Sequence, residues 1–207
     1  QTVFTKYYLH SDGALKPELP EVSAPASSYS YDPNDPVPTI GGPYAYPRSM
    51  SGPRDQLCRK DMFGCRDDLP IWSRPEVLSF VTPRLEEDIE LVGPVTVKLW
   101  ASSSAIDTDF TAKLIDWYPP NEHYPHGFAL GLTDSIIRAR YRESFERSVF
   151  MQPGKVYDFT IDLWSVSNLF KAGHRIRLDI SSSNFPAFDV NPNTGEKVGY
   201  HTRTVVA

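Results

Sequence analysis

The first candidate for chemistry in this sequence is a pair of histidines. His123 and His126 stand three positions apart in "NEHYPHG", with Glu122 beside them. On a helix, this spacing can begin a metal site. The stretch is broken, however, by helix-breaking residues at Pro119, Pro120, Pro125 and Gly127. The sequence therefore favours an exposed loop at this point, and no bound metal is expected.

Two aspartates form a second candidate. Asp107 and Asp109 in "SAIDTDFTAKL" stand two positions apart, and paired carboxylates in a turn can bind calcium. A calcium ion takes about six to eight oxygen ligands, whereas this stretch supplies two carboxylates and a hydroxyl. The favoured interpretation is that one aspartate accepts backbone N–H bonds at a strand corner.

Nucleophile sites and cofactor motifs are not found. The serine runs 102–104 and 181–183 follow predicted strands and lack the strand-turn-helix context of a nucleophile elbow. The sequence contains no phosphate loop and no dinucleotide fingerprint. His174 follows Gly173 at a strand start and is expected to act as a cap or to lie at the surface. The chain alone is therefore expected to be non-catalytic and to use no cofactor.

Cys58 and Cys65 bracket the six residues "RKDMFG". This spacing allows a small disulfide loop, which would reduce the entropy of an otherwise loose insertion. It is equally compatible with two reduced cysteines. Two cysteines alone make a poor metal site.

Composition narrows the class of protein. The 207 residues are 40% hydrophobic, which suits one large domain with a full core. The net charge of −5 gives no basic face for nucleic acid, and no apolar run approaches the ~18 residues of a membrane span. The opening "TVFTKYYL" reads as a strand already under way, as in a fragment of a larger protein. Cellular location and oligomeric state are left open.

Period-2 alternation of apolar and polar residues predicts an all-β fold. Five segments show it clearly: 95–101, 109–115, 135–142, 156–164 and 174–181. Weaker strand candidates are 3–9, 77–82, 87–92 and 201–206, and "GP" at 93–94 is interpreted as a turn. "SVSNLFKAG" at 165–173 is compatible with one or two helical turns. We expect a jelly-roll β-sandwich of galactose-binding-like type with little helix. The residues expected to face its core include Leu99, Phe110, Leu114, Ile161, Leu163, Ile176, Leu178 and Ile180.

Several long segments together resemble a known family. The segments are "YDPNDPVPTIGG" at 31–42, "GPRDQ" at 52–56, and the stretches 102–116, 133–142 and 153–195. They resemble the C-terminal domain of the group that contains X-Pro dipeptidyl-peptidases, cocaine esterase and α-amino-acid ester hydrolases. The resemblance covers nearly the whole chain from about residue 5, although the stretch that holds both cysteines is longer than usual.

The resemblance implies that residues 1–207 form a single C-terminal jelly-roll domain of a serine hydrolase. In this family an α/β-hydrolase domain with a Ser-Asp-His triad and a helical cap domain lie upstream, and neither is present in this chain. These two domains would be the partners of the chain, and the parent protein would act on a small acyl or aminoacyl substrate. Whether the parent is a dipeptidyl-peptidase, an esterase or an acylase, and whether residues follow Ala207, is left open.

The resemblance also suggests a role for the proline-rich segment 31–42. Its three prolines fix φ and remove N–H donors, so the segment is expected to stay extended without a strand partner. Gly41 and Gly42 then permit a sharp turn. The loop that follows is expected to help wall the substrate pocket, with Tyr44, Ala45 and Tyr46 nearest the substrate. The alternative is that the tyrosines cover the edge of the sandwich.

Two tryptophans bear on the competing functions. Trp100 and Trp117 lie on the mostly polar faces of their predicted strands. We expect them to contact the catalytic domain, since large apolar surfaces usually mark a partner. The alternative is an independent carbohydrate- or ligand-binding module, in which both rings would stack on a sugar.

Overall fold

The structure, a computed structural model, describes residues 3–42, 51–197 and 199–207. It is almost entirely β, and all paired strands are antiparallel. The larger sheet has the strand order β3-β8-β5-β6. Its members are β3 (Leu78–Val81), β8 (Arg175–Ser181), β5 (Asp109–Tyr118) and β6 (Phe128–Arg138).

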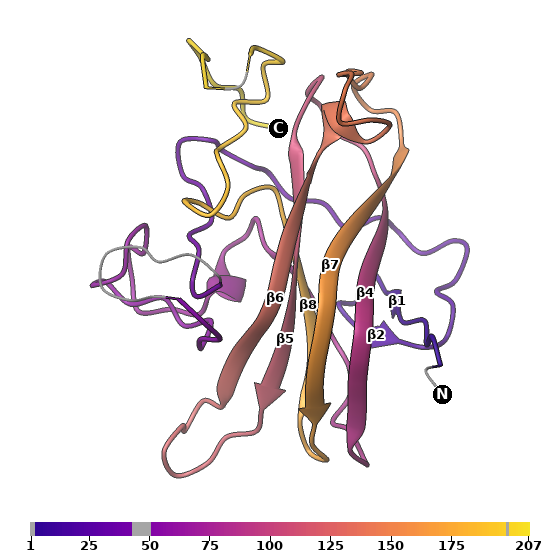
Figure 1. Ribbon diagram of the computed structural model, residues 1–207, viewed down its shortest axis with the longest axis vertical. Helices are drawn as coiled ribbons and strands as arrows, with labels where there is room; N and C mark the ends of the chain where they lie inside the picture. The colour runs from indigo at the N-terminus through magenta and orange to yellow at the C-terminus, as the bar shows by residue number, and fades with distance from the viewer. Residues whose placement is uncertain (1–2, 43–50, 198) are drawn as a thin grey trace.

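A second sheet consists of two long strands, β4 (Ile89–Ala101) and β7 (Tyr157–Phe170), which run the length of the molecule (Figure 1). A short pair near the N-terminus is formed by β1 (Tyr8–Leu9) and β2 (Leu15–Lys16). The helical elements in the described residues are two single 3₁₀ turns, η1 (Ile71–Ser73) and η2 (Ala139–Tyr141). None of them is long and apolar enough to cross a membrane.

The core lies between the two sheets and follows the predicted alternation. Leu114 pairs with Leu178 across β5 and β8, and Val97 pairs with Ile161 across β4 and β7. Of the eight residues predicted to face inward, six are buried in one cluster: Phe110, Leu114, Ile161, Leu163, Leu178 and Ile180. Leu99 and Ile176 are half-buried against the same cluster. The all-β class and the facing of these strands are confirmed, while the jelly-roll, galactose-binding-like connectivity stays a prediction.

Several predicted boundaries are wrong because tertiary pairing overrides the local signal. β4 runs straight through the "GP" pair at 93–94, where a turn was expected. The segment 165–170 continues β7 instead of forming a helix, because each of its residues faces a partner in β4. β6 begins at Phe128 and ends at Arg138, after which the chain forms η2. The segment 201–206 forms no strand.

A bulge bends the long strand pair at Trp164. The register shifts between Pro94 and Thr96, which leaves one extra residue on β7. Trp164 has a φ of 63°, and its N–H donates to Asp162 Oδ1 at 2.8 Å. The aspartate therefore satisfies the amide that the bulge removes from the ladder.

We predict that Leu178→Ala lowers the free energy of unfolding by about 2–5 kcal/mol, because it opens a cavity in the core. Urea denaturation of both proteins would measure the change. Leu169→Ala on β7 of the other sheet is the matched control, since Leu169 is 47% exposed and its truncation should cost under about 0.5 kcal/mol. Equal losses in the two variants would show that the facing of β8 is assigned wrongly.

Candidate functional site

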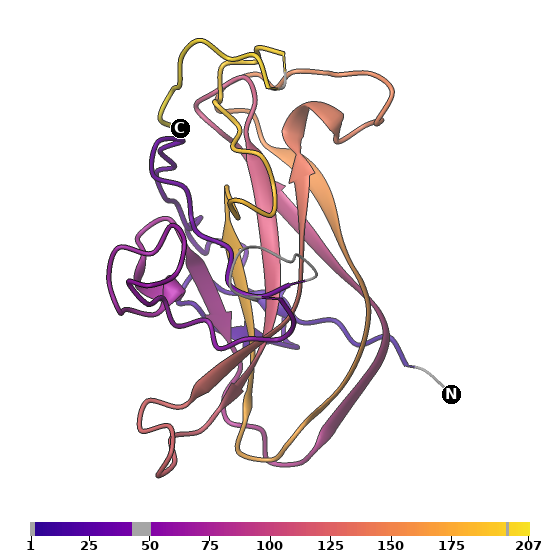
Figure 2. The ribbon, with the colours of Figure 1, turned by 60° about the vertical axis from the view of Figure 1, so that its left-hand side comes forward.

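The outer face of the larger sheet is buried, contrary to the expectation of one polar, solvated face. Thr111, Lys113 and Ile115 of β5 point away from the core and are nevertheless buried, as are Arg177 and Asp179 of β8. The segment that covers them is residues 31–42 and 51–77, which we call the cover. It lies against this sheet at the left of Figure 2. A second apolar cluster forms between cover and sheet, made of Val37, Ile40, Cys58, Ile71 and Val77.

Arg177 holds the cover to the sheet. Its side chain is 0% exposed, and the guanidinium carbon lies 3.7 Å from the ring centroid of Trp72 in the cover and 5.7 Å from that of Trp117 in β5. Arg177 Nε donates to Asp179 Oδ1 at 2.7 Å, and the same oxygen accepts from Ser79 Oγ at 2.7 Å. The charge is thus paired, and its flat face stacks on an aromatic ring.

The proline-rich segment 31–42 is docked along the chain that follows β8. Val37 N donates to Ser183 Oγ at 2.9 Å, Thr39 N donates to Phe185 O at 2.7 Å, and Phe185 N returns a bond to Val37 O at 2.9 Å. The expectation that this segment needs no partner was wrong. Pro36 and Pro38 alternate with residues whose N–H groups make these bonds. The prolines, which have no N–H, therefore stand at positions where no donor is needed.

The proline-rich segment ends at Gly42, which pairs with Gly52 and so forms the base of the loop between them. Gly42 and Gly52 exchange two backbone hydrogen bonds, at 3.0 and 2.7 Å. All three glycines at this base have positive φ: 80° at Gly41, 92° at Gly42 and 83° at Gly52. A Cβ on Gly41 would lie 2.6 Å from Gly52 O, so only glycine fits this approach. The predicted pocket residues Tyr44, Ala45 and Tyr46 lie outside the described residues.

The returning leg of the loop pairs with the edge strand β6. Gly131 N donates to Arg54 O at 2.9 Å, and Gln56 N donates to Ala129 O at 2.9 Å. Asp55 Oδ1 accepts the N–H of Ala129 at 3.0 Å. "GPRDQ" therefore extends the larger sheet beyond β6 and ties the loop base to it.

A buried amine lies beneath this leg. Lys113 is 9% exposed, and its Nζ donates to Gln56 Oε1 at 2.9 Å. Burial lowers the pKa of Lys113, and the carboxylates of Asp134 and Asp179 act in the opposite direction. Sequence reasoning missed Lys113, Gln56 and Arg177, because alternating charged residues on a strand normally indicate a solvated face.

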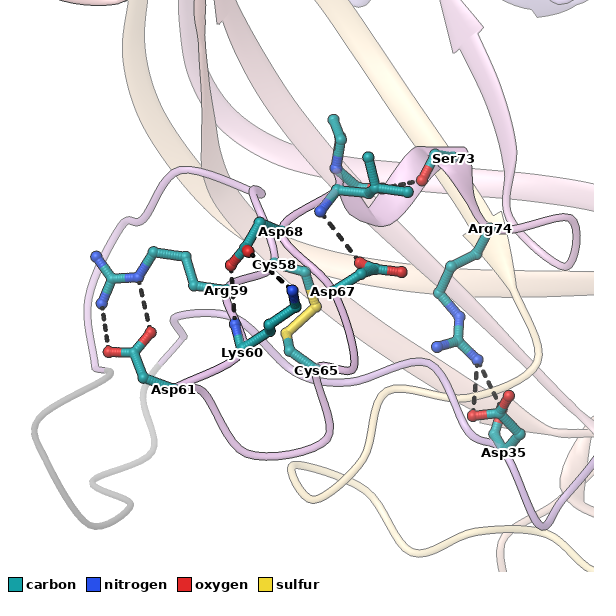
Figure 3. The surroundings of a disulfide bond; sticks show 12 residues. Asp35, Cys58, Arg59, Lys60, Asp61, Cys65, Asp67, Asp68, Ser73 and Arg74 are labelled. Carbon is teal, nitrogen blue, oxygen red and sulfur yellow. Dashed lines mark hydrogen bonds and ion pairs between the residues drawn. A yellow bond between two sulfur atoms is a disulfide. The ribbon is translucent and has the colours of Figure 1, made fainter.

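Cys58 and Cys65 form a disulfide in the cover (Figure 3). The loop that they close rests on the proline-rich segment and on the chain that follows β8. A Cβ on Gly64 would lie 3.0 Å from Cβ of Pro38, and the ring of Phe63 lies 5.7 Å from that of Phe185. Figure 3 also shows an ion pair between the proline-rich segment and the rest of the cover, in which Asp35 lies 3.1 Å from Arg74.

Trp100 and Trp117 are not on one surface. Trp100 is 70% exposed on the outer face of the β4–β7 sheet. Trp117 lies on the outer face of the opposite sheet, half-buried, with its ring centroid 5.8 Å from that of Trp72. The two rings therefore cannot stack together on one sugar.

The carboxylates of Asp107 and Asp109 accept hydrogen bonds from two arginines. Asp107 accepts the backbone N–H of Arg140 at 2.9 Å and its Nε at 2.8 Å, as the strand-corner interpretation requires. Asp109 accepts two bonds from Arg138, both at 2.9 Å, and Asn191 Nδ2 bridges the two carboxylates. Burial raises the pKa of Asp109, and Arg138 opposes that shift.

The histidines and serines also have clear positions. His123 and His126 are exposed in the loop between β5 and β6, where Asn121 Oδ1 accepts the N–H of His123 at 2.9 Å. Within the described residues no group of three or more His, Cys, Asp or Glu could hold a metal. His174, expected at the surface or as a cap, is instead buried with its Nδ1 2.9 Å from Asp116 Oδ1. Ser181, Ser182 and Ser183 are buried.

Comparison with known proteins gives one consistent family. The family model described as "X-Pro dipeptidyl-peptidase C-terminal non-catalytic domain" matches residues 1–205. Cocaine esterase of Rhodococcus sp. (strain MB1 Bresler) is 39% identical over 203 residues, which are 94% of this chain and 32% of that protein.

Solved structures agree. An α-amino acid ester hydrolase superposes with a TM-score of 0.78 at 32% identity, over 93% of this chain and 31% of that one. An aminopeptidase from a marine sediment archaeon, Thaumarchaeota archaeon, superposes with a TM-score of 0.77 at 33% identity, over 92% and 31% of the two chains. The chain thus spans about a third of the length of each of these relatives.

We predict that Arg177→Met lowers the free energy of unfolding by about 3–5 kcal/mol, because it leaves Asp179 buried without its hydrogen-bonded counter-charge. Adding Asp179→Leu should recover most of that loss, since an apolar pair can replace a buried ion pair. Urea denaturation is the measurement, and Arg59→Met beside exposed Asp61 is the matched surface control. A double variant no more stable than the single one would contradict the role given to this pair.

Proposed function

The chain belongs to the family of X-Pro dipeptidyl-peptidase C-terminal non-catalytic domains, and from this we propose that it is the accessory domain of a serine hydrolase. Residues 1–207 form one domain in this proposal. It packs against an α/β-hydrolase domain and a cap domain of the parent protein, stabilises them, and contributes a loop to the wall of the substrate pocket.

The observation that carries the pocket role is the rigid base under the loop. The Gly42–Gly52 pair closes the loop. One leg is the proline-rich segment, which is bonded to Ser183 and Phe185, and pairing with β6 holds the other leg. A loop with both legs held by hydrogen bonds to the rest of the domain can place side chains against a substrate at little cost in entropy.

The names of the relatives support a proposal for the substrate class. Their names include a cocaine esterase, an aminopeptidase and an α-amino acid ester hydrolase, which act on ester or amide bonds. We infer that the parent of this chain hydrolyses an ester or amide next to a small acyl or aminoacyl group by serine acyl transfer. Tyr44, Ala45 and Tyr46 would contact that group without taking part in the chemistry.

The proposed contact with the catalytic domain includes Trp100, whose exposure leaves the ring free to pack against another domain. Trp117 is less suited to this role, because Trp72 and Arg177 already cover part of its ring. The separation of the two tryptophans also removes the main argument for an independent carbohydrate-binding module.

The first prediction from this function is that the isolated chain is inert. Incubation with p-nitrophenyl esters and with aminoacyl-proline anilides should give only background hydrolysis, because the triad is proposed to lie in another domain. The control is the same chain joined to its catalytic domain. Turnover that follows the isolated chain through repeated purification would contradict the proposal.

The second prediction concerns the loop. In the intact parent enzyme, Ala45→Phe should lower kcat/KM for bulky acyl groups relative to small ones, because the larger side chain narrows the pocket. The expected change in discrimination is about 1–3 kcal/mol. Tyr46→Ala should change the ratio in the opposite direction. If both variants fold and leave the ratio of kcat/KM values unchanged, the loop only covers an edge of the sandwich.

A further inference from the structure

One buried side chain joins the two legs of the loop. Gln56 is 1% exposed, and its Nε2 donates to Ile40 O and to Arg54 O, both at 3.0 Å. Ile40 lies two residues before Gly42, and Arg54 lies two residues after Gly52. The amide therefore spans the base of the loop immediately beneath the Gly42–Gly52 pair.

The orientation of this amide is determined by Lys113. An ammonium group can only donate, so it must face the oxygen of the amide and not its nitrogen. With Oε1 held by Lys113 Nζ at 2.9 Å, both N–H bonds of Gln56 are directed to the two carbonyls. The backbone of Gln56 is fixed as well, since its N–H donates to Ala129 O at 2.9 Å and its carbonyl accepts from Ile71 N at 3.0 Å.

Gly131 of β6 provides the space for the amide. A Cβ at this position would lie 2.7 Å from Gln56 Nε2, closer than real Cβ atoms come to a neighbour, and 3.2 Å from its Cδ, which is also tight. The side chain of Gln56 is therefore enclosed by the backbone of β6 on one side and by both legs of the loop on the other.

We propose that Gln56 is a positioning residue for the hydrolysis carried out by the parent enzyme: it fixes the separation of the two loop legs, and Lys113 fixes Gln56. Besides Gln56, the two backbone bonds between Gly42 and Gly52 join the legs, and both of these residues are glycines, whose backbone is conformationally free. The effect on substrates rests on the proposed function, whereas the effect on the loop base does not.

The test is Gln56→Glu in the intact parent enzyme. A carboxylate retains the contact with Lys113 but has no N–H for the carbonyls of Ile40 and Arg54, which it would repel. Hydrogen exchange of the Gly42 and Gly52 amides should accelerate by roughly tenfold or more, as expected for local opening after loss of two hydrogen bonds. The ratio of kcat/KM values for small and bulky acyl substrates should shift by a similar order.

Asn193→Asp is the matched control. Asn193 is a buried amide at 2% exposure near the C-terminus, and its Nδ2 donates to Val205 O at 2.6 Å. This variant also converts a buried amide that donates to a backbone carbonyl into an acid, but that carbonyl belongs to neither loop leg. It should destabilise the domain without selectively accelerating exchange at Gly42 and Gly52 or changing the substrate ratio.

Gly131→Ala tests the same point without a new charge. Its Cβ should displace the Gln56 amide, and exchange at the loop base should again accelerate. If neither Gln56→Glu nor Gly131→Ala accelerates exchange there more than Asn193→Asp does, Gln56 does not hold the loop legs and the proposal is wrong.

The substrate ratio separates the remaining outcomes. Faster exchange with an unchanged ratio would overturn the positioning role. If Ala45→Phe has shifted the ratio in the same enzyme, the failure belongs to Gln56 alone; if Ala45→Phe has also left it unchanged, the pocket role of the loop fails as well. Faster exchange with a shifted ratio supports the proposal.

Discussion

Arg177 places a full positive charge in the interior of the domain, between the larger sheet and the cover. Its pairing with Asp179 and its stacking on Trp72 make that burial tolerable, since an unpaired charge at 0% exposure would strongly destabilise the fold. The cover must stay in place for this arrangement to persist. Loss of the cover would expose the ion pair to water together with the apolar cluster around Ile71.

This constraint makes the larger sheet a layer between two cores. On one side, Leu114 and Leu178 pack against the β4–β7 sheet; on the other, Ile115 and the charged residues of β5 and β8 pack under the cover. The β4–β7 sheet has no corresponding cover within the described residues, and its outer face is exposed. The two faces of the sandwich therefore differ, and the side that carries the cover also carries the proposed pocket loop.

The proposed function depends on this asymmetry. A loop that forms the wall of a pocket has to keep its position when the substrate binds, and a loop whose base is not held in place would move. Here one leg of the loop is held by Ser183 and Phe185, the other by β6, and Gln56 bonds to both. The disulfide between Cys58 and Cys65 and the pair formed by Asp35 and Arg74 reinforce the same region. Stability of the cover and selectivity of the parent enzyme are in this view properties of one unit.

The sequence by itself determined the all-β class, the inward residues of the main strands and the family. Alternation has a period of two because successive side chains of a strand point to opposite faces, and Phe110, Leu178 and Ile161 obey it. Local signals failed where pairing decided the outcome: "GP" at 93–94 lies within a strand, and 165–170 extends β7, because both segments have partners along their whole length.

Only the tertiary structure decided what becomes of the polar residues. Lys113, Arg177 and Asp179 have the spacing of a solvated strand face, and nothing near them in the sequence indicates that residues far upstream will cover them. The same holds for Gln56, whose partners Lys113 and Ile40 are distant along the chain. The physical reason is that burial of a polar group depends on whether a partner with the right geometry reaches it, and that partner comes from long-range packing, which local patterns do not encode.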